Sequence, residues 1–337
     1  NNKITINSTN LETTLKTTIQ TTGGESKEES IAIPIGRLLE ITASIQDQNL
    51  DLQILKENQL EIKTQSGKYL ITGQDINEFP SDPVMSETIS ITINTKELIE
   101  IIDFTKTSVS KDELKPAIQG VLLKIDNTKI LGVSTDGHRL SRIIIKNNTE
   151  QTKEHEIIIP TKFLNLISSF IKKAEKIELE ISKNYISIFH KDLTIFSRII
   201  KDTYPDYEKV IPLDNDKKLS INKTNLINAI KRVSIFSNRT TKQITLKTTN
   251  TKEIVLSTED SEKATKGQET IPCDYSDSEE LKIGFNAHFL LESLHNITKE
   301  EITIFLKGPL SAAVITEKND KENTDKLLLL MPIRLND

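Results

Sequence analysis

The chain has a single cysteine, Cys273, and no tryptophan among its 337 residues. One cysteine cannot build an internal disulfide framework, and such sparing use is typical of a reducing compartment. No apolar run approaches the roughly 18 residues of a membrane span, and the N-terminal residues lack the pattern of a signal peptide. We therefore expect a protein of the cytoplasm.

Recognisable catalytic and metal-binding motifs are also missing. The glycine pair at 23–24 lacks the lysine of a phosphate-binding loop, and the five histidines do not stand at metal-ligand spacing. Ser134 near His138 and Asp136 is a weak case for a hydrolase, because residues within one turn rarely reach the geometry of nucleophile, base and orienting acid. We expect no enzyme, no cofactor and no metal site.

The charge balance is slightly acidic, with 44 basic and 49 acidic side chains and a formal net charge of −5. A protein that binds nucleic acid with its whole surface is strongly basic, which this chain is not. Any contact with DNA must therefore be local, on a face where lysines and arginines gather.

Three segments of the chain resemble one another, at 2–10, 127–136 and 250–259. Only the middle copy continues into Gly137-His138-Arg139, whereas the others read Leu-Glu-Thr and Asp-Ser-Glu. The Asp-Gly dipeptide that opens this stretch is typical of a tight turn, in which Gly137 takes a positive φ. The turn is therefore the first candidate for a function that one copy has acquired.

Amphipathic helices recur with the same period. One kind is expected to begin at 34, 160 and 286, with starts 126 residues apart. A second kind begins after Asn94 and Asn222, whose side chains suit a helix N-cap. The expected helices run from Pro34 through about Ile45, Pro160 through about Lys173, Asn286 through about Ile297, Ile93 toward Ser110 and Ile221 toward Ser237.

Each helix of the first kind is followed by strands with period-two alternation, beginning at Leu50, Ile177 and Ile302, with hairpin turns expected at 56–58, 65–67 and 183–184. This alternation is typical of antiparallel sheets with one solvated face, so the fold class is α+β with three tandem repeats. We expect domains at 1–85, 86–214 and 215–337. The first repeat lacks a counterpart of the helix at 93–110, and about 35–40 residues are expected to be missing from its start.

Three segments together carry a resemblance to a known family. They read Ser134-Thr135-Asp136-Gly137-His138-Arg139-Leu140, Tyr204-Pro205-Asp206-Tyr207-Glu208-Lys209-Val210-Ile211-Pro212 and Met331-Pro332-Ile333-Arg334-Leu335. With the threefold repeat, they resemble the bacterial DNA polymerase III beta subunit, which is the sliding clamp and processivity factor of DNA replication.

The resemblance implies a DNA clamp fold in which a head-to-tail homodimer closes a ring, with antiparallel sheets outside and helices lining the hole around duplex DNA. It also implies a non-catalytic tether for the catalytic subunit of DNA polymerase III, the clamp loader, other polymerases and repair proteins. These partners bind a groove through short hydrophobic peptide motifs. The alternative is a monomeric peptide-binding scaffold that uses the same groove without encircling DNA.

Site residues follow from the resemblance, position by position. The partner-peptide groove comprises Ile118, Thr135, Gly137, His138, Arg139, Leu140, Pro205, Lys209, Val210, Ala313, Leu329, Met331, Pro332, Ile333, Arg334 and Leu335. The DNA-facing residues are Arg37, Lys96, Lys106, Lys111, Lys162, Lys172, Lys173, Lys223, Lys231 and Arg232. The dimer-interface residues are Tyr69, Ile71, Ile235 and Phe236. The simpler interpretations are a solvated helix face for any one lysine, inter-domain core for Leu140 and Val210, and intra-domain core for Ile71.

Overall fold

The computed structural model describes residues 2–23, 28–146, 154–317 and 323–335. By its internal contacts the chain divides into two compact units, one of residues 1–85 with 191–196 and the other of residues 86–190 with 197–337. Within the described ranges, every helix is too short or too polar to cross a membrane.

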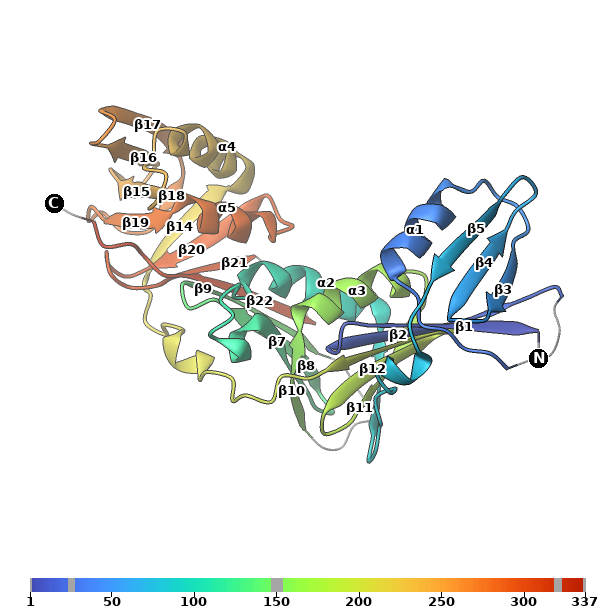
Figure 1. Cartoon of the computed structure of the whole chain (residues 1–337). Coiled ribbons are helices and arrows are strands. Elements are labelled where there is room, and N and C mark those ends of the chain that lie inside the picture. Colours follow the sequence, from blue (N-terminus) through green and yellow to red (C-terminus); the bar gives the residue numbers. More distant parts are fainter. Residues whose placement is uncertain (1, 24–27, 147–153, 318–322, 336–337) are drawn as a thin grey trace. The chain divides into compact units, whose positions relative to one another are not determined.

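The first unit contains a β-hairpin, a small sheet and a helix (Figure 1). The hairpin pairs β1 (Lys3–Thr9) with β2 (Thr13–Gln20), and the sheet consists of β3 (Asp51–Leu55), β4 (Gln59–Lys63) and β5 (Lys68–Thr72). Helix α1 (Ile35–Ser44) packs on this sheet, where Leu60, Ile62 and Ile71 form the buried core. The unit also includes η1 (Ile76–Glu78) and the first residues of β13 (Leu193–Arg198).

The second unit contains a nine-stranded antiparallel sheet in the order β10-β7-β8-β9-β22-β21-β20-β14-β18. Its strands are β7 (Gly120–Ile125), β8 (Lys129–Thr135), β9 (Arg139–Lys146), β10 (His155–Pro160), β14 (Lys217–Asn222), β18 (Asp274–Tyr275), β20 (Glu301–Leu306), β21 (Ala313–Glu317) and β22 (Thr324–Leu330). Strand β22 pairs with β9, with Leu329 opposite Leu140. Strands from the second and third expected repeats therefore share one sheet.

Two further sets of strands complete the sheets of this unit. One contains β6 (Ile89–Asn94), β11 (Lys176–Ile181) and β12 (Tyr185–His190), and the other contains β15 (Gln243–Thr248), β16 (Glu253–Asp260), β17 (Thr265–Pro272) and β19 (Lys282–Asn286). The fold class of α+β with antiparallel sheets is confirmed, and the hairpin turns expected at 56–58, 65–67 and 183–184 separate consecutive strands.

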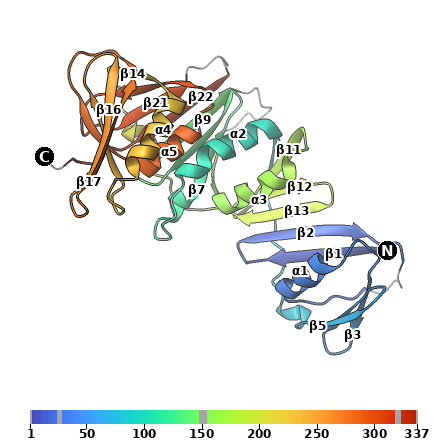
Figure 2. The ribbon, with the colours of Figure 1, turned by 90° about the horizontal axis from the view of Figure 1, so that it is seen from above.

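Four helices of the second unit lie in pairs, α2 (Thr95–Thr105) beside α3 (Thr161–Ile171) and α4 (Lys223–Ser234) beside α5 (Ala287–His295) (Figure 2). Short 3-10 helices are η2 (Lys106–Ser108), η3 (Pro116–Gln119) and η4 (Tyr207–Val210). Helix α2 packs so closely on β8 that a Cβ at Gly132 would lie 2.5 Å from Cγ2 of Ile101. A side chain at this position would push the helix away from the sheet.

The helix starts follow from the residues that precede them. The side chains of Asn94, Asn222 and Asn286 each accept a hydrogen bond from a backbone N–H in the first turn of α2, α4 and α5, which satisfies donors that the helix itself leaves unpaired. Pro34 and Pro160 stand immediately before α1 and α3. The five helices expected from the sequence are present, with boundaries that differ by a few residues.

Candidate functional site

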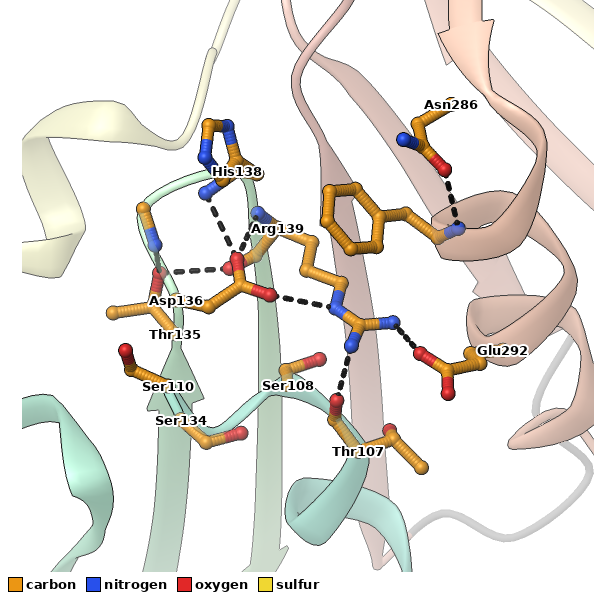
Figure 3. Close-up of polar contacts among 12 residues, drawn as sticks. Thr107, Ser108, Ser110, Ser134, Thr135, Asp136, His138, Arg139, Asn286 and Glu292 are labelled. Atoms are coloured by element: carbon orange, nitrogen blue, oxygen red, sulfur yellow. Dashed lines mark hydrogen bonds and ion pairs between the residues drawn. The ribbon is translucent and has the colours of Figure 1, made fainter. Parts of the chain in front are cut away.

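The turn between β8 and β9 is held by its own polar side chains (Figure 3). Asp136 Oδ1 accepts from the backbone N–H of His138 at 2.9 Å and of Arg139 at 3.0 Å. The Thr135 hydroxyl donates to the carbonyl of Arg139 at 2.7 Å and accepts from the N–H of Gly137 at 3.1 Å. Gly137 has φ of 89°, as predicted from the Asp-Gly dipeptide, a region that favours a residue without a Cβ.

Arg139 joins this turn to two other segments. Its Nε donates to Asp136 Oδ2 at 3.0 Å, Nη1 to Glu292 Oε2 at 2.6 Å and Nη2 to the carbonyl of Thr107 at 2.5 Å. The Arg139 side chain is only 6% exposed, and a buried cation is tolerated when charged partners and hydrogen bonds satisfy its donors. The guanidinium therefore fixes the turn to η2 and to α5.

Helix α5 also supplies an aromatic surface beneath the turn. The ring of Phe289 stacks on that of His138, with centroids 5.8 Å apart and planes at 22°, and the Arg139 guanidinium carbon lies 4.7 Å from the centroid of the Phe289 ring. The side chain of Asn286 accepts from the backbone N–H groups of His288 and Phe289 and so caps the helix. Phe289 and Glu292 were not among the site residues expected from the sequence.

The other face of the sheet carries an apolar floor. Leu140 of β9 pairs with Leu329 of β22, which pairs with Val314 of β21, and all three belong to one buried cluster with Ile118 and Tyr204. Alternation along a strand places neighbouring side chains on opposite faces. The Leu140 side chain therefore lies on the floor, whereas that of Arg139 lies on the helix side.

Ala313, like Arg139, is an expected groove residue whose side chain falls on the face opposite the floor. Ala313 pairs with Leu330, which pairs with Arg139, so Ala313 shares the helix side of the sheet with them. Val314, the next residue along β21, belongs to the floor cluster. A shift of one residue along a strand moves a side chain to the other face.

The segment at 200–212 lies over this floor, with Tyr204 and Tyr207 buried in the cluster. Burial, reinforced by the neighbouring charge of Glu208, raises the pKa of Tyr207 to about 12, so its hydroxyl is protonated at neutral pH. Pro205 is exposed. Lys209 is also exposed and pairs with Asp206 at 2.7 Å, a hydrogen bond that lowers the pKa of the Asp206 carboxyl.

The C-terminal segment 331–335 begins beside the β8–β9 turn. The backbone N–H of Met331 donates to the carbonyl of His138 at 2.8 Å, and that of Ile333 to the carbonyl of Gly284 at 2.8 Å. Leu335 also lies against Gly284, whereas Arg334 is exposed. The side chains of Val210 and Met331 are 51% and 41% exposed, whereas Leu140 is 1% exposed. The site has a buried apolar floor and an exposed apolar rim.

Three of the expected DNA-facing residues have acidic neighbours within the chain. Lys106 pairs with Asp103 at 2.5 Å, Lys223 lies 3.6 Å from Glu300 and also donates to the carbonyl of Ile297, and Arg232 pairs with Glu269 at 2.5 Å. The remaining expected residues in this set are exposed on helices or loops: Arg37, Lys96, Lys111, Lys162, Lys172, Lys173 and Lys231. Several of the expected contacts with DNA therefore compete with acidic side chains of the chain itself.

Three of the four expected dimer residues are exposed, and the fourth, Ile71, is buried. Tyr69 is exposed on β5, at the edge of its sheet, and Ile235 and Phe236 are exposed after the end of α4. Ile71 is buried in the core of the first unit with Leu60 and Ile62. Among the residues that the structure describes, no group of three or more His, Cys, Asp or Glu side chains is placed to hold a metal ion.

Two family models match the chain, the central domain of the DNA polymerase III beta subunit at residues 92–206 and its C-terminal domain at residues 208–334. The beta sliding clamp of Pseudomonas putida KT2440 is 26% identical over 308 residues, which cover 90% of this chain and 82% of the relative. That of Bacillus subtilis is 26% identical over 294 residues, which cover 87% and 75%.

Solved structures share the fold. The DNA polymerase III subunit beta of Pseudomonas aeruginosa matches with a TM-score of 0.91 at 22% identity, covering 99% of this chain and 90% of that one. The beta subunit of Thermotoga maritima matches with a TM-score of 0.88 at 22% identity, covering 100% and 89%. The resemblance expected from the three sequence segments is confirmed.

Proposed function

The chain belongs to the DNA polymerase III beta subunit family, and on this premise we propose that it closes a homodimeric ring around duplex DNA in the cytoplasm. Members of the family are sliding clamps, so the chain is a non-catalytic subunit that acts in DNA replication by binding. Each protomer contributes three clamp repeats, at 1–85, 86–214 and 215–337. The ring holds DNA by topology, which explains why a net charge of −5 is compatible with the function.

The partner site is the floor and rim next to the β8–β9 turn. The observation that carries this assignment is the hydrogen bond from Met331 N–H to the carbonyl of His138, since it places the last residues of the chain beside the turn that distinguishes the middle repeat. Val210 and Met331 are exposed, and each is close in sequence to a buried residue of the floor cluster, Tyr207 and Leu329 respectively. An extended peptide with apolar anchors suits such a surface.

The partners are proteins that must stay with DNA during replication and repair. We assign to this site the catalytic subunit of DNA polymerase III, the clamp loader, other polymerases and repair proteins, each through a short hydrophobic peptide motif. Met331 helps one site accept several motifs, because its unbranched thioether side chain adapts to different shapes.

Contact with DNA is assigned first to exposed lysines on a helix or just after one, with Lys96 on α2 and with Lys172 and Lys173 after the end of α3 as the clearest examples. The phosphate backbone attracts such groups without regard to base sequence. Lys106, Lys223 and Arg232 have carboxylate neighbours within the chain. They contribute less, since binding phosphate would first require them to leave those neighbours.

The dimer contact is head to tail. Tyr69 on the edge strand β5 of one protomer meets Ile235 and Phe236 after α4 of the other, and Ile71 supports the edge from within its own core. A heterologous contact of this kind forms a ring when the rotation closes. Closure also covers exposed sheet edges.

Light scattering of the full-length chain at micromolar concentration tests the ring. We expect twice the mass of one chain, and a monomer under these conditions contradicts the proposal. Ile235→Asp should give monomers, because it introduces a charge into an apolar contact. Leu213→Asp is the matched control, since Leu213 is exposed but lies outside the expected interface, and this variant should remain dimeric.

The partner site is tested with overlapping labelled peptides that cover the catalytic subunit of DNA polymerase III from the same genome. Leu140→Ala combined with deletion of 331–337 should abolish binding of the tightest peptide. Because Leu140 is buried, the exposed double variant Val210→Ser with Met331→Ser provides the same test with less risk to the fold. Unchanged affinity in a folded variant rejects the site.

A further inference from the structure

The side chain of Glu292 on α5 contacts Arg139 next to the partner site, and its other oxygen lies 3.4 Å from Nε2 of His288 on the same helix. We propose that Glu292 is a positioning residue, which holds the β8–β9 turn in its binding geometry without touching the partner peptide. This inference rests on the proposed function of the partner site, whose floor and rim lie next to the turn. It assigns to the third repeat a part in shaping a surface that the second repeat presents.

Arg139 is the point at which three segments meet. Its guanidinium donates to Asp136 in the turn, to the carbonyl of Thr107 in η2 and to Glu292 in α5. Leu140, the next residue, lies on the opposite face in the apolar floor. Arg139 therefore acts from behind the floor, and its contacts determine where the turn lies relative to the floor.

The three acceptors around Arg139 differ in what else they do. Asp136 already binds two backbone N–H groups of the turn, and Thr107 offers a backbone carbonyl. Glu292 is the acceptor that supplies negative charge from outside the turn. Without that charge, Nη1 of a guanidinium that is almost fully buried loses its charged acceptor, which disfavours the present position of Arg139.

Helix α5 has an independent attachment near its end. The side-chain amide of Asn296, immediately after the helix, donates to the carbonyl of Phe104 at 3.2 Å and also to the hydroxyl of Thr107. Removal of the Glu292 charge should therefore leave the helix in place. The expected change is confined to Arg139 and to the turn, where His138 rests on Phe289.

The chain offers a matched control for the loss of this ion pair. Lys326 of β22 pairs with Glu100 of α2 at 3.0 Å, so this pair also joins the second and third repeats. The cation is 9% exposed and the carboxylate 32%, against 6% and 35% for Arg139 and Glu292. Glu292→Gln and Glu100→Gln therefore remove one carboxylate charge from two similar pairs, of which only one lies at the turn.

The experiment compares the two variants in the full-length chain, using the tightest labelled peptide from the polymerase scan as the probe. Glu292→Gln should weaken peptide affinity about tenfold, which corresponds to a free-energy change of about 1.4 kcal/mol, and raise amide hydrogen exchange in 136–139. Both variants should lower the melting temperature by a similar amount. Glu100→Gln, however, should change peptide affinity by less than about twofold. Its exchange at 136–139 should match that of the unmodified chain.

Two results overturn the inference: equal peptide affinities in the two variants, or unchanged exchange at 136–139 in Glu292→Gln. The rim variant Val210→Ser with Met331→Ser, measured with the same peptide, separates this failure from failure of the proposed function. If the rim variant lowers affinity and Glu292→Gln does not, the docking site stands and the positioning role of Glu292 is wrong. If the rim variant binds normally, the site itself is wrong.

Discussion

The carboxylate of Asp136 is the group on which the β8–β9 turn depends most. It accepts three hydrogen bonds, two from backbone N–H groups and one from Nε of Arg139. In Asp136→Asn one oxygen is retained, so the two backbone bonds can persist. The amide that replaces Oδ2 is a donor and would face the Nε–H donor of Arg139, so the charged bond is lost and two donors confront each other.

The cost of this substitution can be bounded from its parts. A hydrogen bond to a charged group contributes about 1.5–3 kcal/mol. Breaking a buried ion pair from one side costs about 3–5 kcal/mol when the other charge is left alone. Arg139 keeps Glu292 as a partner, so we expect a loss of about 2–3 kcal/mol in the free energy of unfolding. This corresponds to roughly 5–10 °C in the melting temperature of a unit of this size.

Scanning calorimetry of Asp136→Asn measures this shift in the transition of the second unit. Asp325→Asn is the control, because Asp325 also pairs with an arginine, Arg142, at 2.7 Å but is 58% exposed. Loss of that pair should cost less than about 1 kcal/mol. If the two variants melt at the same temperature, the carboxylate of Asp136 does not have the role derived from its contacts.

Three further predictions concern backbone strain, packing and pH. Gly137→Ala should lower the free energy of unfolding by about 1–2 kcal/mol, because the φ of Gly137 is 89°. Gly308→Ala is the control, since Gly308 has open space and an unstrained backbone, and its melting temperature should not change. Equal melting temperatures of the two variants would contradict the prediction for Gly137. Gly132→Ala should cost about 1–3 kcal/mol through contact with Ile101, and an unshifted thermal transition would refute it. Because the pKa of Tyr207 is raised in the folded chain, this hydroxyl ionises first in the unfolded chain, so the free energy of unfolding should fall between about pH 10 and about 12. Urea titrations of Tyr207→Phe should lack this part of the fall, and identical pH profiles of the variant and the unmodified chain would disprove the prediction.

Local features of the fold were predictable because they depend on short-range chemistry. Asparagine caps at 94 and 222, the hairpin turn at 56–58 and the positive φ of Gly137 all follow from neighbouring residues. The sequence pattern also indicated antiparallel strands. What it did not indicate was which strand of one repeat pairs with which strand of the next, such as β9 with β22.

This contact between repeats explains why the sequence did not predict Glu292 as a neighbour of Arg139 in the candidate site. Glu292 lies 153 residues from Arg139 along the chain, and no local pattern connects them. Ala313 was expected in the groove from the resemblance, whereas Val314 belongs to the floor, and a shift of one residue along a strand reverses the face. The acidic partner of Arg232, Glu269, lies on a different element, so a helix-face pattern could not show that this arginine is paired.

The central claim is that the protein holds DNA by encircling it. The direct measurement is to load the full-length chain onto a nicked circular duplex with the clamp loader of the same organism and ATP, and then to cut the circle at one site. We predict that the protein co-elutes with the intact circle in gel filtration and is released when the DNA becomes linear. Equal retention on circular and linear DNA, or equally fast loss from both, would contradict a topological ring.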